Sequence, residues 1–167
     1  MKLKNKEQQI ISLVEQAQNI GKELGYENIL QPGFVKELIV ATILDHQVHK
    51  TKHEPDAYDK SDSNIKYEYL SCFEKGSFQF DRMFKSPPDK RAKSLERISR
   101  NSKVYCAVFE KQSPLNVLEI YELEPEVVVK EAERQLDLSS NDISHVGLNI
   151  KWAINNGKRV YPNEQSV

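Results

Sequence analysis

The segment from residue 53 to 72, HEPDAYDKSDSNIKYEYLSC, joins clustered carboxylates to an apolar, strand-like run. Its acids are Glu54, Asp56, Asp59, Asp62 and Glu68. Because side chains alternate between the two faces of a strand, Lys66, Glu68 and Leu70 share a face of the run 65–72. Glu68 is therefore expected among apolar neighbours, where an acid is costly unless it binds a cation or pairs with a base.

A hairpin between this run and the residues before it would bring a second acid, Asp56 or Asp59, beside Glu68. Two carboxylates from adjacent strands form a hard-oxygen site of the kind that Mg²⁺ prefers. A metal there would lower the pKa of a bound water and offset the charge that develops on a phosphate, which is sufficient for phosphodiester hydrolysis. On spacing alone, an acidic surface hairpin without a metal is the alternative interpretation.

This segment also resembles the PD-(D/E)xK nucleases, and among them the PvuII-type type II restriction endonucleases. The resemblance rests on PDAYD (55–59) followed by KYEYLS (66–71). It implies that Asp56 and Glu68 are metal ligands, that the main-chain carbonyl of Tyr69 helps to coordinate, and that Glu54 is an auxiliary acid. Weaker similarities follow in the family's order and cover most of the chain: KELGYENILQ (22–31), KVYCAVF (103–109), LEIYELEP (118–125) and IKWAINNGKRVY (150–161).

The chain departs from the family at its third catalytic residue. The family carries a lysine two positions after the glutamate, whereas this chain has Leu70 there. Leucine can neither orient a water nor neutralise charge. Lys66 and Lys75 are the candidate substitutes, and Lys66 is preferred because it shares the face of Glu68. The expected catalytic set is therefore Asp56, Glu68 and Lys66.

Residues 76–83, GSFQFDRM, follow the acidic strand and are expected to form a loop that reads DNA bases. The resemblance places this region by the major groove. Gln79 could bond adenine, Asp81 could accept from cytosine, and Arg82 could take guanine through two hydrogen bonds. The alternative is that these side chains only bond one another within the loop.

A basic stretch follows, which matters because the net charge of the whole chain is −1 and local charge must attract an anionic partner. A helix over 89–101 would carry a basic stripe, with Ala92, Leu95 and Ile98 on the opposite, buried face. Phosphate contacts by this stripe would give salt-dependent DNA binding, although a merely solvated face is the alternative. The stripe consists of Lys90, Lys93, Arg97 and Arg100.

The remaining pattern predicts an α/β fold, a restriction-endonuclease-like mixed sheet flanked by helices. An amphipathic helix is expected over 3–25 and a more apolar one from Phe34 to Leu44. Strands are expected over 65–72, 104–109 and 117–123, and a further helix from Pro125 to about Leu136. The turn at 155–157 precedes a final hairpin or edge strand.

The length of 167 residues predicts one domain over 1–167. No stretch is long and apolar enough to span a membrane, and the N-terminus lacks the build of a secretory signal, so a cytoplasmic location is expected. Cys72 and Cys106 are expected to be buried thiols. Cutting both strands of duplex DNA favours a homodimer, and the resemblance suggests that region 1–30 forms it.

Three other interpretations remain. His46, His49 and His53 have helical spacing and could hold zinc, but a complete ligand set is hard to assemble. Loss of the lysine could leave a catalytically impaired DNA-binding protein of the same fold. An unrelated protein-interaction domain with an acidic surface hairpin is the third, and it would show no salt-dependent binding to DNA.

Overall fold

The computed structural model describes residues 5–51 and 54–163. The described helices are α1 (Lys6–Glu23), α2 (Phe34–Leu44), α3 (Pro88–Ser99), α4 (Pro125–Leu138) and α5 (Ile150–Asn156). The described strands are β1 (His46–Val48), β2 (Ala57–Asp59), β3 (Lys66–Phe73), β4 (Ser77–Phe84), β5 (Lys103–Phe109), β6 (Val117–Leu123), β7 (Ile143–Asn149) and β8 (Lys158–Tyr161). None of these helices is long and apolar enough to cross a membrane.

Six strands form a mixed sheet in the order β1-β2-β3-β5-β6-β8, in which β3 and β5 are parallel and the other pairs are antiparallel. Strands β4 and β7 form a separate antiparallel pair. The predicted α/β class is therefore confirmed. The three predicted strands are β3, β5 and β6, and β8 is the predicted edge strand.

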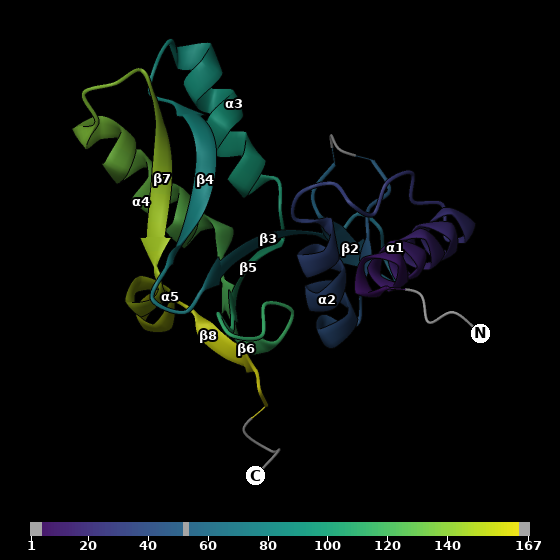
Figure 1. The fold of residues 1–167 in the computed structure, drawn as a ribbon. Coiled ribbons are helices and arrows are strands. Elements are labelled where there is room, and N and C mark those ends of the chain that lie inside the picture. Colours follow the sequence, from purple (N-terminus) through teal and green to yellow (C-terminus); the bar gives the residue numbers. More distant parts are fainter. Residues whose placement is uncertain (1–4, 52–53, 164–167) are drawn as a thin grey trace.

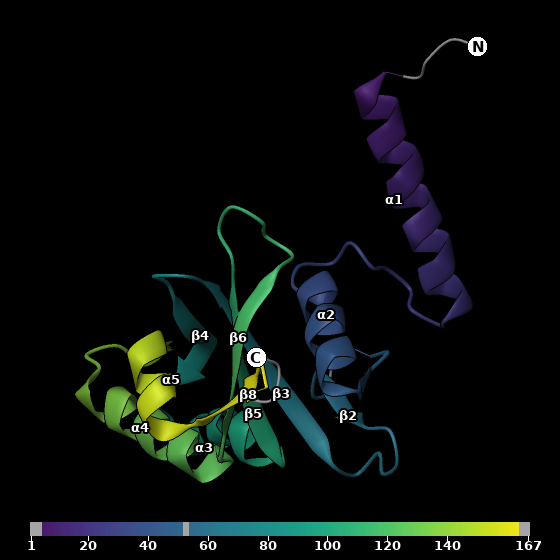
Figure 2. The same ribbon diagram turned by 90° about the horizontal axis from the view of Figure 1, so that it is seen from below.

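The alternation along β3 sends its side chains into two cores. Leu70 and Cys72 join the core shared with α3, α4, β4 and β7, whereas Tyr67 and Tyr69 join the core shared with α2. Figures 1 and 2 show the corresponding layers, with α3 and α4 on one side of β3 and β5, and α2 on the other. Glu68 has the parity of Leu70 and so faces the α3 side.

The apolar face of α1 has no cover from the rest of the described chain. The helix begins at an asparagine capping box, and Gly25, with φ of 89°, follows its C-cap residue. Gly21 is its one buried residue, and Figure 2 shows the helix projecting from the body. The predicted amphipathic helix is confirmed, but its larger apolar side chains are exposed: Ile10, Ile11, Leu13, Val14 and Ile20, with Leu24 at the C-cap.

The prediction of a loop over 76–83 is wrong, because these residues form most of β4. Phe78, Phe80 and Met83 are buried against the α3 side, while Gln79 and Asp81 are exposed on the outer face. The alternation is interrupted by a bulge in the pairing with β7, between Phe80 and Met83. A bulge adds an unpaired residue, which breaks the period of two that identifies a strand.

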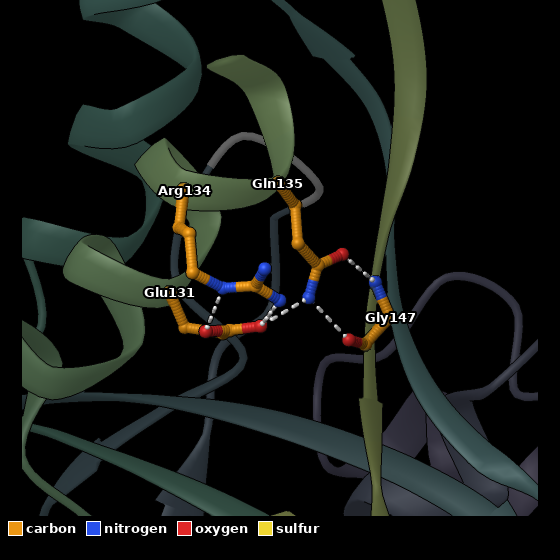
Figure 3. Close-up of polar contacts among 4 residues, drawn as sticks. All are labelled: Glu131, Arg134, Gln135 and Gly147. Carbon is orange, nitrogen blue, oxygen red and sulfur yellow. Dashed lines mark hydrogen bonds and ion pairs between the residues drawn. The ribbon is translucent and has the colours of Figure 1, made fainter. Parts of the chain in front are cut away.

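The free edge of β7 is hydrogen-bonded by a side chain of α4. The Gln135 amide accepts from the Gly147 N–H at 3.0 Å and donates to the Gly147 carbonyl at 2.7 Å (Figure 3). Glu131 accepts a hydrogen bond from the same amide and holds Arg134 through two further bonds. The amide takes the place of a neighbouring strand, so these backbone groups of a two-stranded sheet do not lack partners.

Helix α3 buries Ile98 and part of Leu95 as expected, but the rest of its buried face differs from the prediction. Ala92 is exposed, whereas Ser94 and Ile98 are buried and Leu95 only partly. The Ser94 hydroxyl faces β4, where it accepts a hydrogen bond from the Phe84 N–H at 2.9 Å. The pattern of apolar residues in the sequence does not reveal such a polar contact. Among the other core predictions, Cys72 and Cys106 are buried free thiols.

Candidate active site

The short pairing of β2 with β3 brings the two expected metal-binding acids together. Ala57 pairs with Tyr67, so Asp56 reaches the part of β3 that carries Glu68. Asp56 Oδ2 accepts the Tyr69 N–H at 2.8 Å. The N–H and C=O of a strand residue point to the same edge, so the Tyr69 carbonyl also points toward β2. Asp56, Glu68 and the Tyr69 carbonyl are therefore assembled at one place.

Helix α2 adds a third acid, Glu37, which the sequence analysis missed. Burial, followed by the charge of Asp56, raises the pKa of Glu68 to about 8 and that of Glu37 to about 7. Burial raises the pKa of Asp56 to about 6, against the opposing effect of the Tyr69 N–H. Three partly buried carboxyls therefore repel one another when they ionise: Glu37 on α2, Asp56 just before β2, and Glu68 on β3. Their ionisation leaves an excess of negative charge in this part of the protein.

Two of these acids, Glu37 and Asp56, line a cleft. A hollow of about 340 Å³ is lined by Glu37, His49, Glu54 and Asp56 together with the loop that precedes α2. A second hollow of about 680 Å³ shares Gln31 and Glu37 with the first. The second hollow also has Gln79 and Asp81 of β4 in its wall. Two of the expected base-reading side chains therefore share a hollow with Glu37.

The preferred lysine contacts the auxiliary acid. Lys66 Nζ donates to Glu54 Oε2 at 2.8 Å, and this bond holds the pKa of the exposed Glu54 carboxyl below its usual value. Lys75 lies in the turn between β3 and β4, at the far end of β3 from Glu68. The structure therefore pairs Lys66 with Glu54 and places Lys75 away from the acids.

Two arginines of the predicted basic stripe direct positive charge at the acids. Arg100, at the C-cap of α3, lowers the pKa of both Glu68 and Asp56, and Arg97 lowers that of Glu68. The α3 end is tied to β3 because Ser102 N–H donates to the Lys66 carbonyl at 2.7 Å. The positive charge near Glu68 thus comes from the end of a neighbouring helix.

The other residues of the basic stripe lie in different surroundings from Arg100. Arg97 Nη1 donates to the Asp81 carbonyl at 3.0 Å, so this side chain is bound to β4. Lys90 lies with its Nζ 5.2 Å from the ring centre of Phe84, and Lys93 is exposed. Only the lysines remain on an open helix face.

His49 is a second residue of the cleft that the sequence analysis did not assign to it. Its ring lies 4.5 Å from that of Tyr58, and burial lowers its pKa. Within residues 5–51 and 54–163, its buried Nε2 has no hydrogen-bond partner. An imidazole nitrogen that is buried without a partner is unfavourable for folding, and it lies in the wall of the cleft that also carries Glu54 and Asp56.

The histidines do not form the helical zinc site. Helix α2 ends at Leu44, and His46 begins β1, where its Nδ1 lies 2.7 Å from the Tyr69 hydroxyl and its ring stacks on Tyr67. His46 therefore belongs to the α2 core. The third member, His53, lies outside the described residues.

The third base-reading candidate, Arg82, occupies the bulge of β4. Its φ of 53° is left-handed, and it lines a third hollow, of about 530 Å³, with Asn141, Ser144 and His145. The structure therefore places Arg82 beside β7, whereas Gln79 and Asp81 line a hollow with Glu37.

The donor set fits a hard divalent cation. In the described part of the chain, no three His, Cys, Asp or Glu side chains are close enough together to hold an ion jointly. Mg²⁺ is commonly held by one or two carboxylates with retained waters, so Asp56, Glu68 and the Tyr69 carbonyl suffice. The mutual repulsion of the acids, seen in the raised pKa of Glu68, is what a bound cation would relieve.

In comparisons with protein-family models and with curated proteins, this chain matches none.

Proposed function

We propose that this chain is a Mg²⁺-dependent endonuclease of the restriction type, which hydrolyses phosphodiester bonds of double-stranded DNA. One observation carries the proposal: Asp56 is held at β3 by the Tyr69 N–H, lines a cleft with Glu37, and lies near enough to Glu68 for its charge to raise the pKa of that carboxyl. Such a concentration of buried acid is costly to stability, and costs of this kind are typical of functional sites.

Asp56, Glu68 and the Tyr69 carbonyl would hold Mg²⁺, with Glu37 and Glu54 at its margin. The bound ion would supply an activated water and charge compensation on the phosphate. The protein's own contribution is to fix the carboxylates: Asp56 is held by the Tyr69 N–H, and Glu68 by its place on the sheet.

Arg100 supplies the positive charge that Leu70 cannot. Its charge acts on both Glu68 and Asp56, and its place at the end of α3 leaves it exposed to an incoming phosphate. Lys66 contributes one step away by holding Glu54.

Duplex DNA would lie across β4 and α3. Gln79 and Asp81, in the wall of the hollow next to the acids, and Arg82 at the bulge, would face base edges. Lys90 and Lys93 on the open face of α3 would contact phosphates, while Arg97 would tie α3 to β4 beneath them.

A homodimer in the cytoplasm completes the proposal. The exposed apolar residues of α1 need a partner surface, and a second copy of the same helix would bury them with two-fold symmetry. Two active sites related in this way match the two strands of duplex DNA.

The test is incubation of unmethylated phage DNA with the wild type, with Mg²⁺ or with EDTA, beside an Asp56→Ala variant. Discrete fragments that need Mg²⁺ and are lost in the variant are expected. A parallel binding assay in Ca²⁺ shows whether the variant still binds DNA, which separates lost chemistry from lost folding.

A second candidate function is favoured by Leu70 at the lysine position: a DNA-binding protein of the same fold that does not cut. The same experiment decides between the two. Wild type that binds DNA but leaves it intact at every Mg²⁺ concentration would support this second function and contradict the first.

A further inference from the structure

Tyr69 is joined to the acids through its main chain and to the core shared with α2 through its side chain. Its N–H donates to Asp56 Oδ2 at 2.8 Å, and its carbonyl points to the same edge of β3. Strand β2 covers that edge only as far as Tyr67, which pairs with Ala57. The N–H and C=O of Tyr69 are therefore outside the β2–β3 ladder, so that ladder does not fix their orientation.

The Tyr69 hydroxyl shares a hydrogen bond with His46. His46 Nδ1 lies 2.7 Å from this hydroxyl, beside the core that contains Tyr69. The imidazole stacks on the Tyr67 ring, with 4.0 Å between the ring centres and 21° between the planes. The ring centre of Tyr105 lies 5.3 Å from that of His46. The imidazole thus packs against two tyrosines while it bonds the third.

A sharp turn at the end of α2 brings His46 to this place. Asp45, the C-cap residue, has a left-handed φ of 57°, and β1 begins with the next residue. His46 pairs with Asp59 of β2, and its ring lies on the face of the sheet that carries the Tyr69 side chain. The consecutive elements α2 and β1 therefore supply Glu37 near the acids and His46 at the Tyr69 hydroxyl.

The other two tyrosines of this cluster bond carboxylates, whereas Tyr69 bonds an imidazole. Tyr67 donates to Asp59 at 3.3 Å, and Tyr105 donates to Glu122 at 3.1 Å. An imidazole can share a hydrogen bond with a hydroxyl while it carries no charge. A carboxylate in its place would add to the repulsion among the acids. The partner of Tyr69 is thus a group that can hold the hydroxyl without bringing more negative charge to the acids.

We infer that His46 is a positioning residue of the metal site. Through the Tyr69 hydroxyl it would fix the Tyr69 main chain, and with it the carbonyl that would face Mg²⁺ and the N–H that holds Asp56. The inference rests on the part of the proposed function that assigns Mg²⁺ to these acids. Removing groups that orient a metal ligand without touching the metal commonly weakens metal binding by about 10- to 100-fold. His46 is then needed for metal affinity rather than for the chemical step.

The experiment is calorimetric titration of Mn²⁺ into the protein without DNA, for the wild type, Tyr69→Phe, His46→Leu, His46→Asn and the matched control Tyr67→Phe. Tyr69→Phe and His46→Leu should each raise the Kd for Mn²⁺ by about tenfold. His46→Asn should recover much of the affinity, because its side-chain amide can bond the hydroxyl. Tyr67→Phe removes a hydroxyl from the same cluster and should leave the Kd unchanged.

Single-turnover cleavage gives a second readout. In Tyr69→Phe, the Mg²⁺ concentration for half-maximal cleavage should rise by about tenfold, whereas the rate at saturating Mg²⁺ should stay near that of the wild type. A lower rate at saturating Mg²⁺, with the half-maximal concentration unchanged, would contradict a role in positioning the metal site.

Tyr69→Phe decides the matter, because it keeps the aromatic ring and its packing. A lower melting temperature with an unchanged Kd for Mn²⁺ would mean that the pair stabilises only the fold, and would overturn the inference. Equal weakening by Tyr67→Phe would also overturn it, since the effect would then belong to the whole cluster. A wild type that binds Mn²⁺, loses it in Asp56→Ala and cuts no DNA would contradict the nuclease alone. A wild type that binds no Mn²⁺ would contradict both.

Discussion

At the scale of single residues, three carboxyls lie in surroundings where burial opposes their ionisation. Glu68 faces the side of the sheet that carries Leu70 and Cys72, and Asp56 and Glu37 face the same cleft. Their raised pKa values mean that ionisation destabilises the folded chain. The same property makes the site attractive to a cation, so stability and function are coupled through these acids.

The first prediction concerns pH. A carboxyl whose folded pKa is raised stabilises the fold fully below its unfolded value, here about 4.5, and loses that contribution as pH rises through about 8 for Glu68. Without divalent metal, thermal stability should therefore fall between pH 6 and pH 8. Glu68→Gln should be more stable than the wild type at pH 8, by about 1 to 3 kcal/mol after allowance for solvent screening.

Thermal unfolding followed by circular dichroism measures this effect, and the exposed Glu133→Gln variant is the control. Burial lowers the pKa of His46, which acts in the opposite direction and removes stability as pH falls below about 6.5. A wild type whose stability rises steadily from pH 6 to pH 8 without metal would contradict the description of the acids.

The second prediction concerns Arg100. If it supplies the missing positive charge, Arg100→Ala should lower the cleavage rate by about 100-fold or more, and Arg100→Lys should restore much of it. Single-turnover cleavage measures the rate, while binding in Ca²⁺ shows whether affinity has changed. Equal loss in both variants, with binding also lost, would indicate a structural role instead.

At the scale of elements, α3 contacts β4 with one face and reaches the acids with its C-terminal end. Its buried Ser94 and Ile98 pack toward β4, its end brings Arg100 to the acids, and its open face carries Lys90 and Lys93. The helix thus connects the strand that would read bases to the site that would cut.

The third prediction tests this division. Replacing Lys90 and Lys93 together with alanine should weaken binding to all duplexes alike. The slope of log affinity against log salt should become shallower by about 2, because each lost phosphate contact contributes about 0.9. Fluorescence anisotropy across a salt series measures it, and an unchanged slope would mean that these lysines only face solvent.

Local patterns predicted most of the elements. The period of β3 and the proline and glycine signals around α1, α2 and α4 were sufficient to predict these elements. The PDAYD and KYEYLS segments predicted that Asp56 lies beside Glu68. The prediction failed at β4, because the bulge near Arg82 breaks the alternation and its partner β7 lies far along the chain.

The site roles that the sequence did not reveal share one reason. Glu37 and His49 were not assigned to the acids, and Arg100 was predicted only as part of the basic stripe. Only the packing of α2 and the end of α3 against β3 brings these residues to the acids. No spacing within the sequence marks a residue whose role depends on such long-range packing. The sequence predicted Lys66 as the substitute lysine because it shares the face of Glu68, whereas in the structure its Nζ contacts Glu54.

At the scale of the whole molecule, α1 differs from the rest of the described chain in how well its apolar surface is covered. The rest of the described chain has one buried core on each face of the six-stranded sheet, whereas α1 exposes Ile10 at 61% and Leu13 at 64%. Exposed apolar rows of this kind mark interaction surfaces. A second copy of the chain is the partner that the proposed cleavage of both DNA strands requires.

The fourth prediction follows. Ile10→Glu combined with Leu13→Glu should convert a dimer to a monomer, since buried charge without a partner is strongly unfavourable. Analytical ultracentrifugation measures the mass, with Lys130→Glu on α4 as a control. The monomer should nick plasmid DNA rather than cut both strands at once. A wild type that sediments as a monomer at all concentrations would contradict the dimer.

The most direct test of the central claim is the Mg²⁺ dependence of single-turnover cleavage by the wild type and by Glu68→Gln, which keeps the shape of the side chain but not its charge. The account predicts cleavage that saturates with Mg²⁺ in the wild type and falls by about 1,000-fold or more in the variant, with DNA binding retained. Equal cleavage rates in the two proteins, or cleavage that persists in EDTA, would contradict the assignment of these acids as a metal-dependent nuclease site.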